Sequence, residues 1–91
     1  MEVVVGGIYK HFKGCKVEVI ALAKHSETLE DMVVYKHLDT LEFWVRPYNL
    51  FTSKVDKEKY PDVLQEYRFE LINNDWSRRY NIKYSRLWWN K

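Results

Sequence analysis

The sequence is poor in residues that break or cross-link a chain. Only three glycines, two prolines and one cysteine occur among its 91 residues, whereas hydrophobic residues make up 46%. So few chain breakers at this apolar content exclude a disordered chain and predict one small folded domain. The single cysteine, Cys15, excludes an internal disulfide, so the expected compartment is the reducing cytoplasm.

Long apolar runs are also absent. No stretch approaches the roughly 20 consecutive apolar residues that a membrane-spanning helix needs. The opening MEVVVGGIYK has no basic region followed by an apolar run, so it does not resemble a signal peptide. We therefore expect no association with a membrane.

The charges are distributed unevenly along the chain. Residues 1–72 hold ten Lys or Arg and twelve Asp or Glu, a net charge of −2, whereas residues 73–91 hold five basic residues against Asp75 alone, a net charge of +4. Three of the four tryptophans also lie in this last segment. These contrasts divide the chain into a mildly acidic body, residues 1–72, and a basic, aromatic extension, residues 73–91.

Short alternating or β-branched runs dominate the body. They predict strands over residues 7–12, 16–25, 32–38, 42–46, 52–55 and 68–72, with no internal repeat among them. Residues 48–51 suit one helical turn, and the charged segment 56–67 suits a loop that contains another. In the run 16–25, apolar residues lie on both faces of the predicted strand: Val17, Val19, Ala21 and Ala23 on one, Ile20 and Leu22 on the other. This pattern predicts a strand that is covered on both sides for part of its length. Five or six short strands at this spacing predict a mainly β fold, a small barrel.

The extension fits two periods. Trp76, Tyr80, Tyr84 and Trp88 recur at every fourth residue, which predicts one stripe of a helix, and the length of the segment favours this interpretation. The same segment also alternates, because these residues and Ile82 all lie at even positions, and aromatic residues favour strands. A helix would pack its stripe on the barrel or on a second copy, whereas an extended segment would offer rings and cations for stacking and phosphate binding. The arginines available for such a surface are Arg78, Arg79 and Arg86.

The segment KHSETLED, residues 24–31, is the densest in polar chemistry. His25 and its acidic neighbours have the groups that a metal or acid–base site needs, but only one histidine is local and the ligand spacing of a metal site is missing. A solvated loop whose hydroxyls satisfy nearby backbone groups is the common use of such a segment. Alternatively, an anionic ligand accepts hydrogen bonds from donors of this segment, namely Lys24, His25, Ser26 and Thr28. We expect no metal and no other cofactor.

A second candidate site lies in the run FWVRP. Trp44 and Arg46 are two residues apart and therefore share one face of a strand, and Tyr35 is expected on the neighbouring strand. An arginine beside aromatic rings binds planar or anionic groups. In the alternative interpretation, Trp44 caps the barrel core and Arg46 pairs with Glu30 or Glu42.

No arrangement typical of a nucleophilic enzyme is present. Cys15 lies in a predicted turn near two lysines, which would lower the pKa of its thiol, but no sequence signature supplies a catalytic base. The three glycines match neither of the phosphate-binding fingerprints. We therefore expect a non-catalytic protein.

Four segments of the body occur in an order that points to a known family. They are GIYKHFKG (7–14), AKHSETLEDMVVY (23–35), WVRPYNLF (44–51) and KYPDVLQEYRFE (59–70). Over about residues 6–72 the chain resembles a bacterial and phage family of small proteins known as a domain of unknown function. The resemblance implies an SH3-like barrel without an established activity, and it does not extend beyond Ile72. It suggests a surface site at His25, Thr28, Glu30, Tyr35, Trp44 and Arg46.

Together these observations favour a non-catalytic binding module. The residues available suit a nucleotide, a nucleic acid or another phosphate-bearing planar ligand better than an apolar one. The alternative from another class is a protein-interaction module that docks a partner segment on Tyr35 and Trp44. A narrower alternative is a phage-encoded protein that sequesters a host signalling nucleotide. The extension would add packing, homo-oligomerisation or positive charge.

Overall fold

The structure, a computed structural model, describes residues 2–73, which form five strands and one short helix. In chain order the elements are β1 (Ile8–His11), β2 (Lys16–Lys24), β3 (Asp31–His37), β4 (Phe43–Pro47), α1 (Tyr48–Phe51) and β5 (Phe69–Asn73). The prediction of a mainly β fold is thereby confirmed. The predicted stripe or strand between Trp76 and Trp88, with the arginines of the extension, lies outside the described residues.

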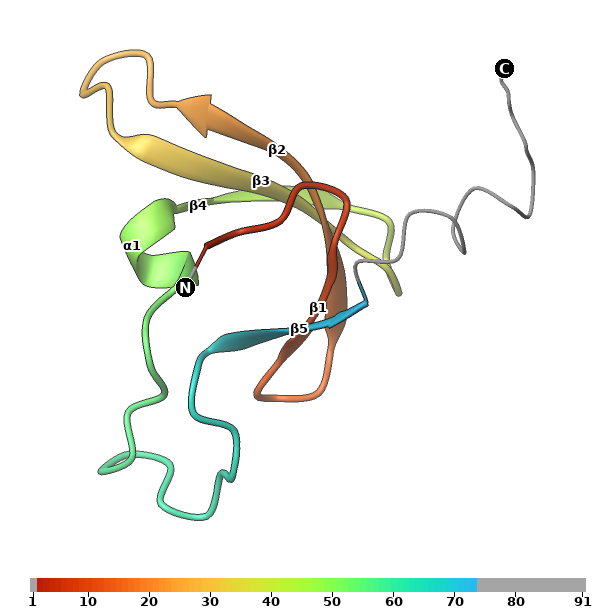
Figure 1. Cartoon of the computed structure of the whole chain (residues 1–91), viewed down its shortest axis with the longest axis vertical. Helices are drawn as coiled ribbons and strands as arrows, with labels where there is room; N and C mark the ends of the chain where they lie inside the picture. Colours follow the sequence, from red (N-terminus) through yellow and green to blue (C-terminus); the bar gives the residue numbers. More distant parts are fainter. Residues whose placement is uncertain (1, 74–91) are drawn as a thin grey trace.

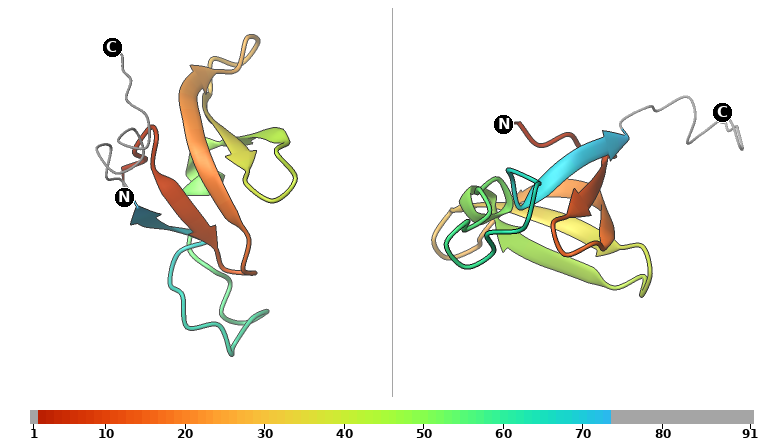
Figure 2. Two further views of the ribbon diagram at one scale, coloured as in Figure 1. Left: turned by 90° about the vertical axis from the view of Figure 1, so that its right-hand side faces the viewer. Right: turned by 90° about the horizontal axis from the view of Figure 1, so that it is seen from below.

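All five strands belong to one antiparallel sheet with the order β4-β3-β2-β1-β5. The first four strands follow one another along the chain, and β5 returns to pair with β1 at the opposite edge. The sheet curls around its core until its two edges come to face each other (Figures 1 and 2). Within residues 2–73, however, β4 and β5 do not pair, so the described part of the chain is an open barrel.

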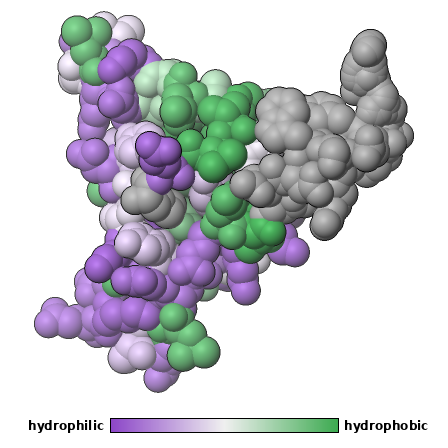
Figure 3. All heavy atoms as spheres, in the orientation of Figure 1, coloured by the Kyte–Doolittle hydropathy of each residue, from purple (hydrophilic) through white to green (hydrophobic). Residues whose placement is uncertain are grey.

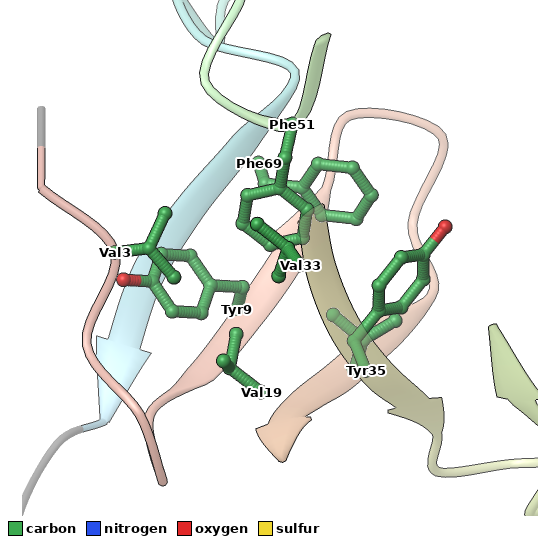
Figure 4. Packing of buried hydrophobic residues seen from close by; sticks show 8 residues of the cluster. Val3, Tyr9, Val19, Val33, Tyr35, Phe51 and Phe69 are labelled. Atoms are coloured by element: carbon green, nitrogen blue, oxygen red, sulfur yellow. The ribbon is translucent and has the colours of Figure 1, made fainter. Parts of the chain in front are cut away.

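The core is small and rich in aromatic rings. Its buried hydrophobic residues are Val3, Tyr9, Val17, Val19, Val33, Tyr35, Phe51, Val55 and Phe69. Phe51, the last residue of α1, stacks on Phe69 of β5 with ring centroids 4.2 Å apart, and it also contacts Tyr9 and Tyr35 (Figure 4). Because α1 follows β4 directly, this stacking links the β4 edge of the sheet to the β5 edge. The link is made by side chains and not by backbone hydrogen bonds between the two strands.

One detail of the strand prediction is wrong. The strand expected over residues 52–55 is reduced to a single bridge between Lys54 and Tyr67, because the charged loop 56–67 turns away after one pair. The turn of helix expected in that loop corresponds to one hydrogen-bonded turn, in which the N–H groups of Lys59 and Tyr60 donate to the carbonyl of Asp56 at 3.2 and 2.8 Å.

Within residues 2–73, β2 is not covered on both sides, contrary to prediction. Val17 and Val19 are buried, but Ile20 and Leu22 are exposed. The register of β2 against β3 shifts between Val19 and Ala21, which marks a bulge at Ile20. Beyond this bulge Leu22 lies opposite the buried Val33, on the core face. The bulge therefore accounts for the change of phase in the apolar pattern.

The segment before β1 lies between β2 and β5. The N–H of Gly6 donates to the carbonyl of Val19 at 2.8 Å, and the N–H of Val19 donates to the carbonyl of Gly7 at 3.0 Å. A Cβ atom on Gly7 would lie 2.8 Å from Cδ1 of Leu71. A larger residue would require the Leu71 side chain to shift, so Gly7 lets the N-terminal segment lie close to the end of β5.

Candidate ligand-binding site

The pairing of β3 and β4 brings three of the predicted site residues together. Tyr35 lies directly opposite Trp44, and Val33 lies opposite Arg46. Directly opposed residues of an antiparallel pair share one face of the sheet. Tyr35, Trp44 and Arg46 therefore lie on the face that carries the core, in the neighbourhood that the sequence predicts.

Tyr35 and Trp44 differ in exposure. Tyr35 is only 3% exposed, because its ring packs against Phe51 and Phe69, and its hydroxyl points away from the cluster (Figure 4). Trp44 is 52% exposed and does not cap the core. The ring of His37 meets the indole edge-to-face, with the ring centroids 5.7 Å apart. Trp44 rather than Tyr35 therefore offers ring surface for stacking.

Arg46 reaches from β4 across the gap toward β5. Its guanidinium carbon lies 5.4 Å from the centre of the Phe69 ring, a cation–π contact. Neither Glu30 nor Glu42 pairs with it, and within residues 2–73 its side chain makes neither an ion pair nor a hydrogen bond. The partly buried guanidinium thus keeps its five N–H donors available for an external acceptor.

Further basic groups surround Arg46. The pKa of His11 is lowered to about 4, first by burial and then by the positive charges of Arg46, Arg68, Lys13 and His37. His11 is consequently neutral near pH 7, and its Nδ1 accepts a hydrogen bond from the backbone N–H of Lys13 at 3.1 Å. Apart from burial, the causes of this lowered pKa are basic side chains from several segments, so these side chains lie near one another at this end of the sheet.

We call His11, His37, Trp44, Arg46 and Arg68 the basic–aromatic site. Only Trp44 and Arg46 of this set are predicted from the sequence. The missing signal is topological, because β1 and β3 both run antiparallel to β2, so His11 and His37 end their strands at the same side of the sheet. Arg68 precedes β5, and its Nε donates to Oγ of Ser53 at 3.0 Å.

The predicted site residues of the β2–β3 loop lie elsewhere. His25, Thr28 and Glu30 lie beyond the first pair of β3, whereas Trp44 faces Tyr35 near its other end (Figure 1). Four steps along the strand, about 13 Å, separate Asp31 from Tyr35, whereas Arg46 lies opposite Val33, two steps from Asp31. The strand therefore separates the loop residues from Trp44, and within residues 2–73 neither a hydrogen bond nor an ion pair joins them to Arg46.

The loop residues satisfy one another. The backbone N–H groups of Glu27 and Thr28 donate to Nδ1 of His25 at 3.2 and 3.3 Å. The N–H of Glu30 donates to Oγ1 of Thr28 at 3.2 Å. These contacts correspond to the solvated-loop interpretation, in which polar side chains shape the turn.

The β2–β3 and β3–β4 loops carry one repeated pattern, HSETLE at residues 25–30 and HLDTLE at residues 37–42. In each loop the histidine N–H donates to the carbonyl of the final glutamate, and the leucine N–H donates to the histidine carbonyl, all at 2.8 Å. Leu29 and Leu41 have φ angles of 62° and 63°, and both side chains are exposed. The same hairpin turn therefore occurs at both ends of β3, a repeat of turns and not of strands.

Cys15 is not an activated thiol. Its pKa is raised above the ordinary value, first by burial and then by the negative charge of Asp39, which together outweigh the opposite effect of Arg46. The lowered pKa expected from the neighbouring lysines is therefore wrong. Among residues 2–73, no three His, Cys, Asp or Glu residues gather in a group that could hold a metal ion.

The fold and the site together define a small, mainly β domain with a basic, aromatic surface at one end of its sheet. The chain belongs to the family described as "Protein of unknown function (DUF1653)", whose model matches residues 7–71. No curated protein and no solved structure matches the chain. In the part of the chain that the structure describes, every helix is too short or too polar to span a membrane.

Proposed function

We propose that the domain is a non-catalytic cytoplasmic binding module for a nucleotide, a nucleic acid or another planar ligand that carries phosphate. The observation that carries the proposal is Arg46, whose guanidinium lies over Phe69 without an anionic partner in residues 2–73. A partly buried guanidinium without an anion loses hydration and gains no ion pair, which is costly. An external phosphate supplies the partner, because the planar guanidinium donates two parallel hydrogen bonds to it.

The surroundings of Arg46 favour negative charge. The pKa of His11 falls to about 4, so an added proton is strongly disfavoured at this point. Burial is the first cause of this shift and does not itself favour an anion, but the positive charges that add to it, those of Arg46, Arg68 and Lys13, attract one. His37 and Arg68 lie close enough to contribute to this shift, so several segments act on the same ligand position.

Trp44 favours a planar group beside the anion. The indole is half exposed and lies on the same face as Arg46. Stacking of a base on an aromatic ring contributes about 1–3 kcal/mol in single-strand binding proteins. A phosphate on Arg46 and a base on Trp44 together correspond to a nucleotide.

Calorimetry and tryptophan fluorescence with mononucleotides, dinucleotides and short single-stranded oligonucleotides test this proposal. We expect Arg46→Ala to weaken binding about 10- to 100-fold, because a hydrogen bond to a charged group contributes about 1.5–3 kcal/mol. Lys24→Ala is the matched control, since that exposed cation already pairs with Asp31 and its loss should leave the affinity unchanged. If the intact protein binds none of these ligands, the proposal fails.

A parallel variant separates the two predicted halves of the site. His25→Ala alters the β2–β3 loop without touching Trp44 or Arg46, so we expect unchanged affinity. A loss of affinity with His25→Ala but not with Arg46→Ala would move the binding site to the loop.

In a narrower form of the proposal, the protein is of bacterial or phage origin and a phage-encoded copy sequesters a host signalling nucleotide. Sequestration needs binding without turnover, which fits a site that lacks an activated Cys15. Incubation with candidate nucleotides, heating and mass spectrometry of the released ligand test this form. An unchanged nucleotide supports sequestration, whereas a hydrolysed product contradicts a non-catalytic protein.

The exposed side of β4 favours a second candidate function, the docking of a protein segment. β4 is an edge strand, and Phe43 and Val45 are more than half exposed. A shallow hollow beside them is lined by Leu41, Glu42, Phe43 and Trp44. An extended peptide can pair with such an edge and seat its side chains there. Affinity that hardly changes with salt supports docking, because phosphate recognition weakens steeply as salt rises.

A further inference from the structure

Four apolar side chains stay exposed beside the end of β5. Val5, Ile20, Leu71 and Ile72, which we call the apolar patch, are between 36% and 50% exposed. The contacts of the glycines at positions 6 and 7 join the segment around Val5 to β2 on one side and to Leu71 on the other. Figure 3 shows hydrophobic side chains gathered on this face, over β2 and the end of β5.

Two bulges present the isoleucines of the apolar patch. Ile20 lies where the register of β2 against β3 shifts. Ile72 has no opposite residue, because Ile8 pairs with Asn73 and the next pair joins residues 9 and 71. A bulged residue is released from the ladder and its side chain is re-aimed. Strand pairing therefore does not require an apolar residue at either position. Two isoleucines at these positions indicate that another segment packs over them.

The chain itself continues from the apolar patch. β5 ends at Asn73, opposite Ile8, and residues 74–91 follow. The large apolar and aromatic residues of this segment are Trp76, Tyr80, Ile82, Tyr84, Leu87, Trp88 and Trp89. Residues 73–91 carry a net charge of +4 against −2 for residues 1–72, so the two parts also attract each other.

We propose that residues 74–91 fold back on the domain and cover the apolar patch with their tryptophans. A segment tethered at Asn73 stays at a high effective concentration near the apolar patch, so a small contact area is sufficient to hold it. A second copy is a poorer cover, because a stable interface takes about 20–30 residues from each side, far more than this patch offers. The inference is independent of the ligand proposed for the basic–aromatic site.

Tryptophan fluorescence of the full chain tests this inference. Trp44→Phe removes the one tryptophan outside the extension, so the remaining emission reports Trp76, Trp88 and Trp89. We expect this emission at the short wavelength of buried indole, with weak quenching by acrylamide. Adding Ile20→Lys places a charge in the apolar patch and should shift the emission to longer wavelength. Adding Leu64→Lys, at an almost fully exposed leucine of the loop 56–67, should leave it unchanged.

Three results would overturn the proposal. One is the emission of solvated indole in the Trp44→Phe chain, and another is emission that does not respond to Ile20→Lys. The third is a dimer mass by native mass spectrometry together with emission that depends on concentration, because a second copy would then be the cover. If circular dichroism shows that Ile20→Lys unfolds the domain, Val5→Lys on the N-terminal segment takes its place, with the same two outcomes.

Discussion

His11 is the residue on which the charges of the basic–aromatic site act most directly. Burial and four neighbouring basic side chains hold its pKa at about 4, whereas an unfolded chain leaves histidine near 6.5. Between these values the unfolded state binds the extra proton, so the free energy of unfolding falls as the pH drops from about 6.5 to about 4. The sequence does not reveal this residue, because most of the charges that act on it come from other strands.

We expect His11→Gln to remove part of this pH dependence. Urea unfolding at about pH 7 and about pH 5 measures it, and the intact chain should lose more stability than the variant between these conditions. His25→Gln, at an exposed histidine of the β2–β3 loop, is the control and should behave like the intact chain. Equal losses in the intact chain and in His11→Gln would contradict the prediction.

Cys15 gives a second prediction at this scale. Lysines near it in the sequence suggest a reactive thiolate, but in the fold burial and Asp39 raise its pKa. Because the thiolate is the reacting form, we expect iodoacetamide to modify the folded chain more slowly than a free cysteine at the same pH. Asp39→Asn should speed the reaction, whereas Asp31→Asn, at the opposite end of β3, should not. Rapid modification of the intact chain near neutral pH would count against this account.

Among the elements, alternation predicts strands well where a single period holds. The five observed strands begin and end within one residue of the runs 7–12, 16–25, 32–38, 42–46 and 68–72. The failures have a common cause. The bulge at Ile20 and the single bridge at Lys54 depend on the register of a partner strand, which one segment's composition does not encode.

The repeated hairpin turn gives a prediction about stability. Leu29 and Leu41 hold left-handed backbone conformations, which cost a residue with a Cβ atom about 1–2 kcal/mol and cost glycine little. Part of that gain is lost to the greater freedom of glycine in the unfolded chain, so Leu29→Gly and Leu41→Gly should each raise the free energy of unfolding by about 1 kcal/mol. Leu64→Gly, at an exposed leucine without a positive φ, should not raise it. Urea titrations measure all three, and destabilisation by both loop variants would refute the prediction.

The whole molecule is held together across its gap by side chains from distant segments. The sequence places Trp44 and Arg46 together because they share a strand, and this part of the site is predictable. The sequence does not show that Trp44 and His25 lie apart, because the distance between them depends on the length of β3 between its two turns. Nor can it place Phe51 on Phe69, since no local pattern links a helical turn to a strand so far along the chain.

Phe51 should therefore determine the stability of the entire domain. Its side chain is fully buried and contacts rings from three strands. We expect Phe51→Ala to lower the free energy of unfolding by about 3–5 kcal/mol, a large share of the 5–15 kcal/mol typical of a domain. Thermal melts followed by circular dichroism measure the effect. Leu50→Ala, at the exposed neighbour in α1, is the control, and a loss as large as that of Phe51→Ala would show that the gap is held in another way.

The position of Arg46 over Phe69 has a mechanical consequence. The arginine belongs to β4, at one edge of the curled sheet, and the phenylalanine belongs to β5, at the other edge. A ligand that binds the guanidinium therefore acts as a reversible cross-link between the two edges. We expect such a molecule to slow amide hydrogen exchange along both borders more than in β2, at the centre. The ligand would then take the place of the backbone hydrogen bonds that β4 and β5 do not form with each other. Hydrogen exchange of the backbone amides would thus report how much of the site is occupied by ligand.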